Sequence, residues 1–250
     1  MHPPGEEVVE PMDVQPEKLD HFGGEHGGVA GGGWLRPAVF GVMDGLVTNV
    51  SLIAGVGGGH GSRHTIVLTG LAGLVAGAFS MATGEYASVS SQNHAIGAEV
   101  AIEARELRVN SEVEAQELAA HWVERGISAE TAIAFATELA EHPDEALRVH
   151  IQQELGVDPH ELPSPWAASS SSFVFFAVGA ILPLLPYLFG YASLPTAIGI
   201  GAVGLLVAGF AVARFTRRPP LRSGLRQLAL GVLAIGITYL VGRLIGASSL

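Results

Sequence analysis

Residues 77–86 read Gly-Ala-Phe-Ser-Met-Ala-Thr-Gly-Glu-Tyr and mark where an apolar segment gives way to an acidic one. Residues 65–84 carry no charge, whereas acidic residues recur at helical spacing further along the chain. Met81 and Glu85 are four residues apart, so they share one face of a continuous helix. A thioether and a carboxylate at the end of an apolar helix indicate a site for a divalent transition metal.

The composition favours a membrane protein that attracts cations. Apolar residues make up 48% of the 250 residues and charged residues only 15%, against about 25% charged residues in soluble domains. The net charge is −11, with seven acids and one Lys in residues 1–35 and fifteen acids against four Arg in residues 99–161. This balance argues against a nucleic-acid partner, which requires basic surface. The chain has no Cys, which excludes thiolate metal sites and disulfides.

Five segments are apolar enough to be membrane spans. They lie between Arg36 and Arg63, at 65–84 with a helical extension to Ser91, near 167–189, at 194–213, and between Arg226 and Arg243. The third and fourth come from 52 uncharged residues that Pro183, Pro186, Gly190 and Pro195 divide in two. The last is short, but an Arg at each end can reach the interface. We therefore expect an all-α, polytopic protein with five transmembrane helices.

The distribution of arginine predicts the orientation of these spans. A cluster between the fourth and fifth spans is expected to be cytoplasmic: Arg214, Arg217, Arg218, Arg222 and Arg226. Counting spans back from it places the N-terminus and the acidic region in the cytoplasm and the C-terminus outside. The expected location is the plasma (inner) membrane of a prokaryote rather than a vacuolar membrane.

The chain divides into four parts. Residues 1–33 are rich in Gly, Pro and acids without periodicity, which predicts a disordered acidic tail. Residues 34–95 hold the first two transmembrane helices, and 163–250 hold the third to fifth. Residues 96–162 form the expected cytoplasmic, three-helix, acidic metal-binding domain.

One charge, Asp44, lies inside the first span, about eight residues or roughly 10–12 Å from its cytoplasmic end. Met81 lies at a similar depth in the antiparallel second span, so the two could face each other. A carboxylate buried in lipid costs a few kcal/mol, and such groups are functional by default. Three structural alternatives stay open: Asp44 hydrogen-bonded to Thr48 or Asn49, Met81 filling a gap in packing, and Glu85 marking the lipid boundary.

Helix signals divide the acidic region. Ser111 with Glu114 predicts a capping box, Gly126 and Gly156 can end helices, and Ser128 and Pro143 can begin them. The acidic candidates on the first two helices form two pairs, Glu103 with Glu106 and Glu114 with Glu117. A break at Asn110–Ser111 would fold the pairs together, with His150 and Glu154 closing the site. Carboxylates with one imidazole suit Fe²⁺, Mn²⁺ or Zn²⁺ better than Mg²⁺ or Ca²⁺. The alternative is a solvated acidic surface.

The chain resembles the vacuolar iron transporter family from Arg36 to the C-terminus. The most specific parts of the resemblance are Asp44-Gly45-Leu46-Val47-Thr48-Asn49, Ser80-Met81-Ala82-Thr83-Gly84-Glu85-Tyr86 and Ser90-Ser91-Gln92, followed by the acidic helical insert. It implies a homodimer of five-span subunits that exports Fe²⁺ from the cytosol in exchange for protons. Asp44 and Met81 match ligands of the translocation path. Glu103, Glu106, Glu114, Glu117 and Glu154 match carboxylates of the metal-binding domain, where His150 stands at a position that can be Met.

Two other functional classes are weaker interpretations. A membrane-anchored iron-oxidising enzyme built on a helical carboxylate site would use Glu-x-x-His, and no Glu in this chain stands three residues before a His. A metal-storage or metal-sensing protein would use its spans only as anchors. Asp44 argues against that class, because an anchor has no need of a buried carboxylate.

Overall fold

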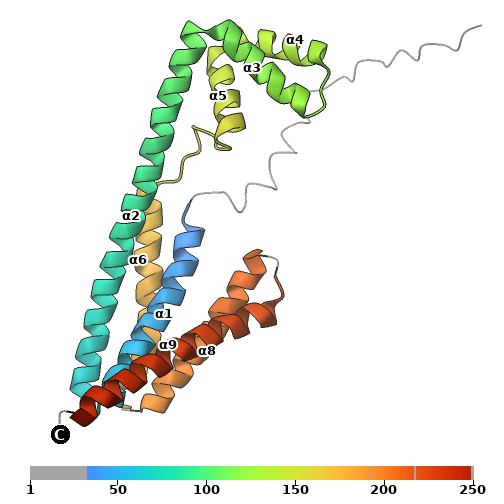
Figure 1. The fold of residues 1–250 in the computed structure, drawn as a ribbon. Helices are drawn as coiled ribbons and strands as arrows, with labels where there is room; N and C mark the ends of the chain where they lie inside the picture. The colour runs from blue at the N-terminus through green and yellow to red at the C-terminus, as the bar shows by residue number, and fades with distance from the viewer. Residues whose placement is uncertain (1–32, 192, 217, 249–250) are drawn as a thin grey trace, which may run out of the picture. The chain divides into compact units, whose positions relative to one another are not determined.

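The structure is a computed structural model that describes residues 33–191, 193–216 and 218–248. Within these ranges every regular element is a helix, and five helical segments are long and apolar enough to cross a membrane (Figure 1). The predicted all-α class and the five spans are confirmed, and the chain is an integral membrane protein. Apart from Gly33, the predicted disordered tail lies outside the described residues.

A tight turn joins the first two spans. Helix α1 runs Leu35–Gly58 and α2 runs Arg63–Val109. Between them His60, flanked by two glycines, adopts a left-handed φ of 60°. With 47 residues, α2 is about 70 Å long, roughly twice the thickness of the hydrocarbon core. The helix that spans the membrane therefore also carries the first carboxylates of the acidic region, and the predicted boundary between residues 95 and 96 falls inside it.

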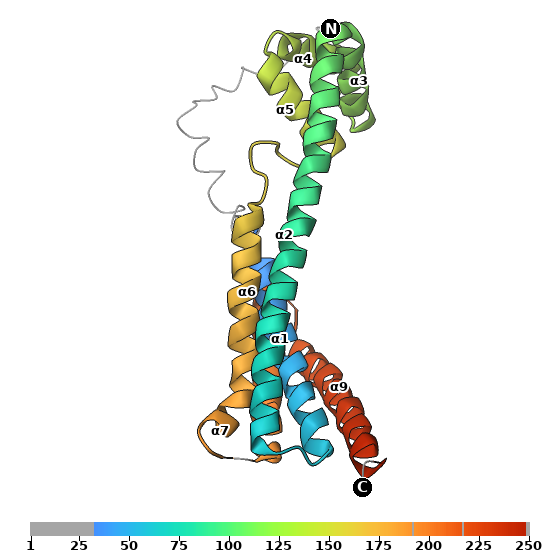
Figure 2. The same cartoon turned by 90° about the vertical axis from the view of Figure 1, so that its left-hand side faces the viewer.

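Close backbone contacts hold α1 against α6, which runs Pro165–Ile181. A Cβ atom on Gly45 would lie 2.2 Å from the carbonyl oxygen of Phe176, and one on Gly179 would lie 2.2 Å from that of Val42. Small residues permit such an approach between membrane helices. Figure 2 shows α1, α2 and α6 running side by side, and α1 also packs against the last two helices.

Prolines shape the remaining membrane segments. After α6 the chain continues through the 3₁₀ helix η2 (Leu182–Leu184) and the short α7 (Leu185–Leu188), so the third span covers Pro165–Leu188. Helix α8 runs Leu194–Thr216 and α9 runs Pro220–Ser248. The fifth span, α9, has 29 residues, so the short apolar run between Arg226 and Arg243 is the centre of a longer helix.

Small residues in α2 and α8 serve packing within the chain. Gly73 of α2 faces Leu52, and Gly77 faces the Phe176 ring. Gly204 of α8 faces Leu46, at a cluster that includes the buried Leu205. These glycines therefore let α2 and α8 pack closely against other helices of the same chain.

Three short helices fill the acidic region: α3 (Ser111–Glu124), α4 (Ala129–Ala140) and α5 (Pro143–Glu154). Their hydrophobic core consists of Leu118, Ala119, Ala132 and Ala136. The break falls at Asn110, as predicted. Ser128 caps α4 by accepting a hydrogen bond from the Thr131 amide, and Gly126 and Gly156 adopt positive φ angles of 97° and 68° after α3 and α5.

The predicted capping box at the start of α3 is wrong. Asn110 is the residue that precedes α3, and it makes no side-chain capping hydrogen bond. Its carbonyl accepts hydrogen bonds from the amides of Val113 and Glu114 instead. Ser111 is already helical, because Asn110 alone separates the end of α2 at Val109 from the start of α3. The side chain of Glu114 is thereby released from capping and is buried.

Candidate metal site

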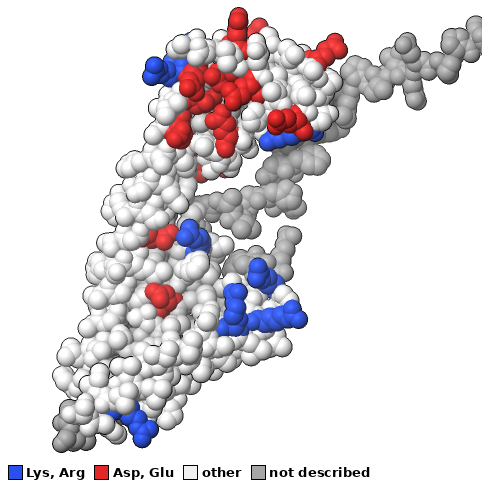
Figure 3. Space-filling model, in the orientation of Figure 1, with Lys and Arg blue, Asp and Glu red and all other residues white. Residues whose placement is uncertain are grey.

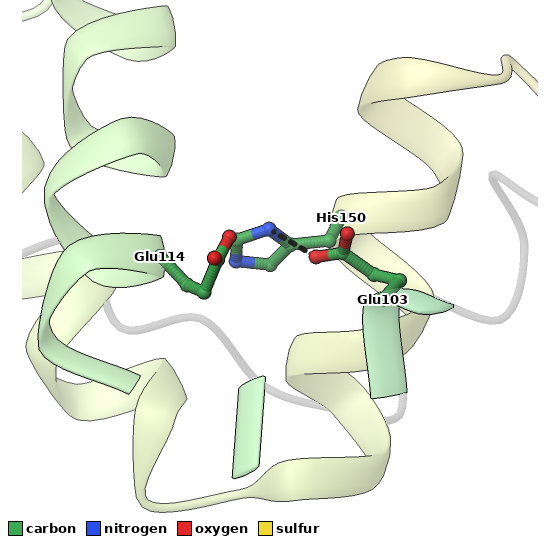
Figure 4. A group of neighbouring side chains, drawn as sticks. All are labelled: Glu103, Glu114 and His150. Atoms are coloured by element: carbon green, nitrogen blue, oxygen red, sulfur yellow. Dashed lines mark ion pairs between the residues drawn. The ribbon is translucent and has the colours of Figure 1, made fainter. Parts of the chain in front are cut away.

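Three helices each contribute one buried polar side chain to a cluster in the acidic region. Glu103 comes from α2, Glu114 from α3 and His150 from α5. The turn at Asn110 reverses the chain so that α3 returns toward α2, and α5 packs against α2. Figure 4 shows the three side chains pointing toward one another from their separate helices. Acidic side chains also gather on the outer surface of this region (Figure 3).

The cluster has the dimensions of a cation site. One ligand atom from each of Glu103, Glu114 and His150 lies within 4.8 Å of the others. The Nδ1 atom of His150 is 3.0 Å from Oε1 of Glu103. The three residues are only 4% to 7% exposed. Within the described residues, this is the group of three or more His, Asp or Glu side chains that could hold a metal ion.

One oxygen of this cluster lacks a hydrogen-bond partner. Although Oε1 of Glu103 lies close to His150, it is buried and accepts no hydrogen bond of acceptable geometry in the described structure. A buried polar atom without a partner costs about 1–3 kcal/mol, and more if it is charged. Convergence of the oxygen and the nitrogen without a hydrogen bond between them is the arrangement that two ligands of one cation adopt.

The pKa shifts within the cluster also favour a bound cation. Burial, followed by repulsion from Glu154, Glu114, Glu106 and Glu117, raises the pKa of Glu103 to about 7. This part of α2 lies about 28 Å beyond Gly84, well outside the apolar segment. Burial is also the main cause that raises the pKa of Glu114 and lowers that of His150. Without a cation, the buried groups are therefore driven toward their neutral forms.

The other predicted acidic ligands surround this core. Glu106, Glu117 and Glu154 are exposed, yet each contributes to raising the pKa of Glu103, so they lie within electrostatic reach of it. The structure thus brings to one region both predicted Glu pairs and the predicted pair on α5, His150 and Glu154. Only one residue from each set enters the buried centre.

Sequence reasoning missed His121. It is half-buried on α3, and its charge would lower the pKa of both His150 and Glu154, so it lies near both. Its spacing of four residues from Glu117 places it on the same face of the helix. That spacing was the available signal for a second imidazole at this cluster.

The predicted membrane ligands do not form a comparable cluster within one chain. Asp44 is exposed on α1 and accepts a 3.4 Å hydrogen bond from Oγ1 of Thr48. Met81 is half-buried against the cluster of Ala78, Phe176 and Ala180. Glu85 is half-buried one helical turn further along α2. Asn49, an alternative partner for Asp44, is buried and donates to the carbonyl of Ala180 instead.

Five membrane helices and a buried carboxylate–imidazole cluster define a polytopic membrane protein with a candidate site for a divalent metal. The model of the VIT family matches residues 35–243, which is most of the chain, so the chain belongs to the VIT family.

The chain covers most of the length of several named relatives. The chain is 28% identical to vacuolar iron transporter 1 of Arabidopsis thaliana, over 96% of this chain and 98% of the relative. It is 34% identical to vacuolar iron transporter homolog 1 of Oryza sativa subsp. japonica, covering 89% and 80%. It is also 34% identical to the vacuolar iron transporter of Acanthamoeba castellanii, covering 84% and 78%.

Proposed function

We propose that this protein transports Fe²⁺ out of the cytosol across the membrane in exchange for protons, with Mn²⁺ and Zn²⁺ as further cargoes. The observation that carries the proposal is the buried convergence of Glu103, Glu114 and His150 in a chain of the VIT family. Two carboxylates and an imidazole form a donor set that suits these ions better than Mg²⁺ or Ca²⁺. The relatives are named as iron transporters, which supports transport over enzymatic chemistry.

The acidic helices act first, as the capture site. Their carboxylates concentrate cations near the protein by long-range attraction. Glu106, Glu117 and Glu154 on the rim would receive the ion, and the buried residues would hold it. An ion there satisfies the orphaned oxygen of Glu103 and removes the repulsion among the carboxylates. Because α2 is continuous, the capture site and Met81 are parts of one rigid element.

The membrane step uses Asp44, with Met81 and Glu85 beside it. Asp44 is exposed in the single chain, and a carboxylate facing lipid costs at least about 2.5–3.5 kcal/mol. A second copy of the chain that covers this face of α1 removes the cost and encloses a polar path. We therefore place Asp44 at the interface of a homodimer, where two copies of the carboxylate can bind one ion.

Proton coupling follows from competition at the carboxylates. A carboxylate binds a metal ion when it is deprotonated, so protons and metal compete for the same oxygens. Protons that enter from an acidic outer side displace the metal from Asp44 and return inward on the emptied site. The cluster of Arg between α8 and α9 supports a cytoplasmic position for the acidic helices by the positive-inside rule. In either a vacuolar or a plasma membrane, this orientation moves the ion out of the cytosol.

Purified full-length protein in liposomes tests this proposal directly. With a pH gradient imposed, uptake of Fe²⁺, Mn²⁺, Zn²⁺ and Ca²⁺ is compared with that of empty liposomes while the lumenal pH is recorded. We expect uptake of the three transition metals with opposite proton movement and none of Ca²⁺. Metal uptake that does not depend on the pH gradient would contradict proton coupling. Equal uptake of Ca²⁺ would contradict selection of the metal by the nitrogen ligand.

A further inference from the structure

The turn between α8 and α9 presents a concentrated basic surface. Arg214, Arg218, Arg222 and Arg226 are all exposed, and we call these four residues the arginine patch. Figure 3 shows Lys and Arg side chains gathered over the end of α8 and the start of α9. An amide hydrogen bond of 3.2 Å from Arg218 to the Ala213 carbonyl closes the end of α8.

Within the described residues, no Asp or Glu lies within ion-pair distance of the arginine patch. The sequence contains no Asp or Glu after Glu161, whereas residues 162–250 contain six Arg. Among the described residues, the basic side chains found within ion-pair distance of a carboxylate are Arg148 and His150, which belong to the acidic helices. In the described structure the arginine patch therefore carries a net positive charge that calls for an anionic partner.

The packing of α8 against α9 fixes the patch at the membrane surface. The two helices approach closely where Gly209 meets Gly224, whose backbone would lie 2.7 Å from a Cβ on Gly209. Ser223 and Gly224 are buried against α8. Apolar sequence of α8 ends at Ala213, and that of α9 resumes after Arg226. The patch therefore sits between two membrane spans, at the level of the lipid headgroups.

Exposed leucines lie beside the arginines on α9. Leu221 is 63% exposed and Leu225 is 52% exposed, one helical turn apart. Arg222 and Arg226 have the same spacing and form a parallel row one residue further along the helix. At the first turns of a membrane-spanning helix, an apolar row can insert between lipid tails while the neighbouring cationic row reaches the headgroups.

We propose that the arginine patch binds the headgroup phosphates of anionic phospholipids in the surrounding bilayer. A guanidinium group donates two parallel hydrogen bonds to a phosphate and is more easily desolvated than an ammonium group. Each Lys or Arg near an anionic membrane surface strengthens binding by a factor of about five. The leucines hold α9 at the depth at which the guanidinium groups reach the phosphates. Because this binding needs no metal, it is independent of the proposed transport.

The test compares two double variants of the full-length protein in phosphatidylcholine vesicles that contain phosphatidylglycerol. Spin-labelled phosphatidylglycerol and phosphatidylcholine report the preference of the protein for the anionic lipid. Arg222→Gln with Arg226→Gln should reduce this preference at least five-fold. Arg105→Gln with Arg108→Gln, two exposed positions near the end of α2, removes the same charge and should leave the preference unchanged.

Further arms separate the phosphate site from its alternatives. Arg222→Lys with Arg226→Lys keeps the charge and should retain most of the preference, and Arg226→Gln alone gives a smaller loss if the double variant fails to fold. Equal losses in the two Gln pairs, or no loss in the α9 pair, would overturn the proposal. Displacement of the anionic lipid by inorganic phosphate at constant ionic strength would assign the patch to a soluble anion instead.

Discussion

The two predicted metal-binding regions share helix α2 but differ in how many ligand atoms converge within one chain. At the Glu103 end of α2, ligand atoms from three helices of one chain meet within 4.8 Å. At the Met81 end, the thioether packs beside Phe176, and Asp44 is exposed on α1. The first region can hold an ion within a single chain, because the Asn110 turn brings α3 and α5 to α2. In the described chain the second region lacks converging partners, and in the proposed homodimer a second subunit would complete it.

The difference also separates binding from transport. In the proposed mechanism, an ion would stabilise the buried carboxylates and imidazole of the acidic helices and would be retained there. Asp44 lies in an apolar segment, where few groups would hold the ion and it could leave. Ions cross a membrane when binding is strong enough for entry but weak enough for release. We infer that affinity is set mainly by the acidic helices and transport rate mainly by Asp44.

The largest expected effect comes from Asp44. Asp44→Ala should reduce Fe²⁺ transport in liposomes to less than about one hundredth, because loss of a direct ligand exceeds the 10–100-fold effect typical of groups that only orient one. Equilibrium binding of Fe²⁺ to the detergent-purified protein, measured by calorimetry, should be nearly unchanged. The matched control is Thr48→Val, which removes the hydroxyl that donates to Asp44 and should reduce transport only slightly. Retained transport in Asp44→Ala would refute Asp44 as an essential ligand of the translocation path.

Substitution of His150 should affect metal binding more than transport, the reverse of the effect expected for Asp44. His150→Gln removes the nitrogen ligand from the buried cluster and should weaken Fe²⁺ and Zn²⁺ binding by about 10–100-fold, while transport at saturating metal persists. His142→Gln, an exposed histidine one residue before α5, should leave binding as it is. If His150→Gln abolishes transport even at saturating metal, the acidic helices control opening of the translocation path in addition to supplying the ion to it.

Glu103 makes the stability of the metal-free protein depend on pH. Its pKa is raised from 4.5 to about 7, so the native state binds more protons than the unfolded state between these values. Stability from this group is therefore greatest below about pH 4.5 and is lost as pH rises to 7, by an amount on the order of 2–3 kcal/mol. The lowered pKa of His150 has the opposite effect on the pH dependence of stability, because the stability that this group contributes is lost as pH falls below 6.5.

A comparison of variants isolates the contribution of Glu103. Glu103→Gln should be more stable than the unmodified chain at pH 7.5 and about equal to it at pH 4.5, in thermal unfolding with a chelator present. Glu130→Gln, at an exposed acid on α4, should show no such pH-dependent difference in stability. A Glu103→Gln protein that is less stable at both values would mean that the carboxylate forms a stabilising contact without metal.

How much the sequence could predict differs between these regions for a physical reason. Charge-free runs, prolines and glycines are local signals, and they predict the five spans, the break at Asn110 and the start of α5. The choice of Glu103, Glu114 and His150 as the buried centre depends on how α3 and α5 rotate about their axes. That rotation is set by contacts such as Leu118 with Ala132, which are distant in sequence. Spacing alone therefore listed Glu114 both as a capping-box residue and as one of six candidate ligands, and it passed over His121.

The smallest expected effect concerns the stretch of α2 that joins the two regions. Gly84 lies inside this helix, and a Cβ added there would meet nothing within 4 Å. Gly84→Ala should therefore raise stability by about 0.5–1 kcal/mol, because alanine loses less backbone entropy in a helix. Gly77→Ala is the matched control, since its Cβ would lie 2.3 Å from the Phe176 ring, and it should destabilise by about 1–3 kcal/mol. Thermal unfolding and the oligomeric state in detergent measure both. Destabilisation or dissociation in Gly84→Ala would show that a partner helix covers this face of α2, and would place the subunit interface along the helix that carries Met81.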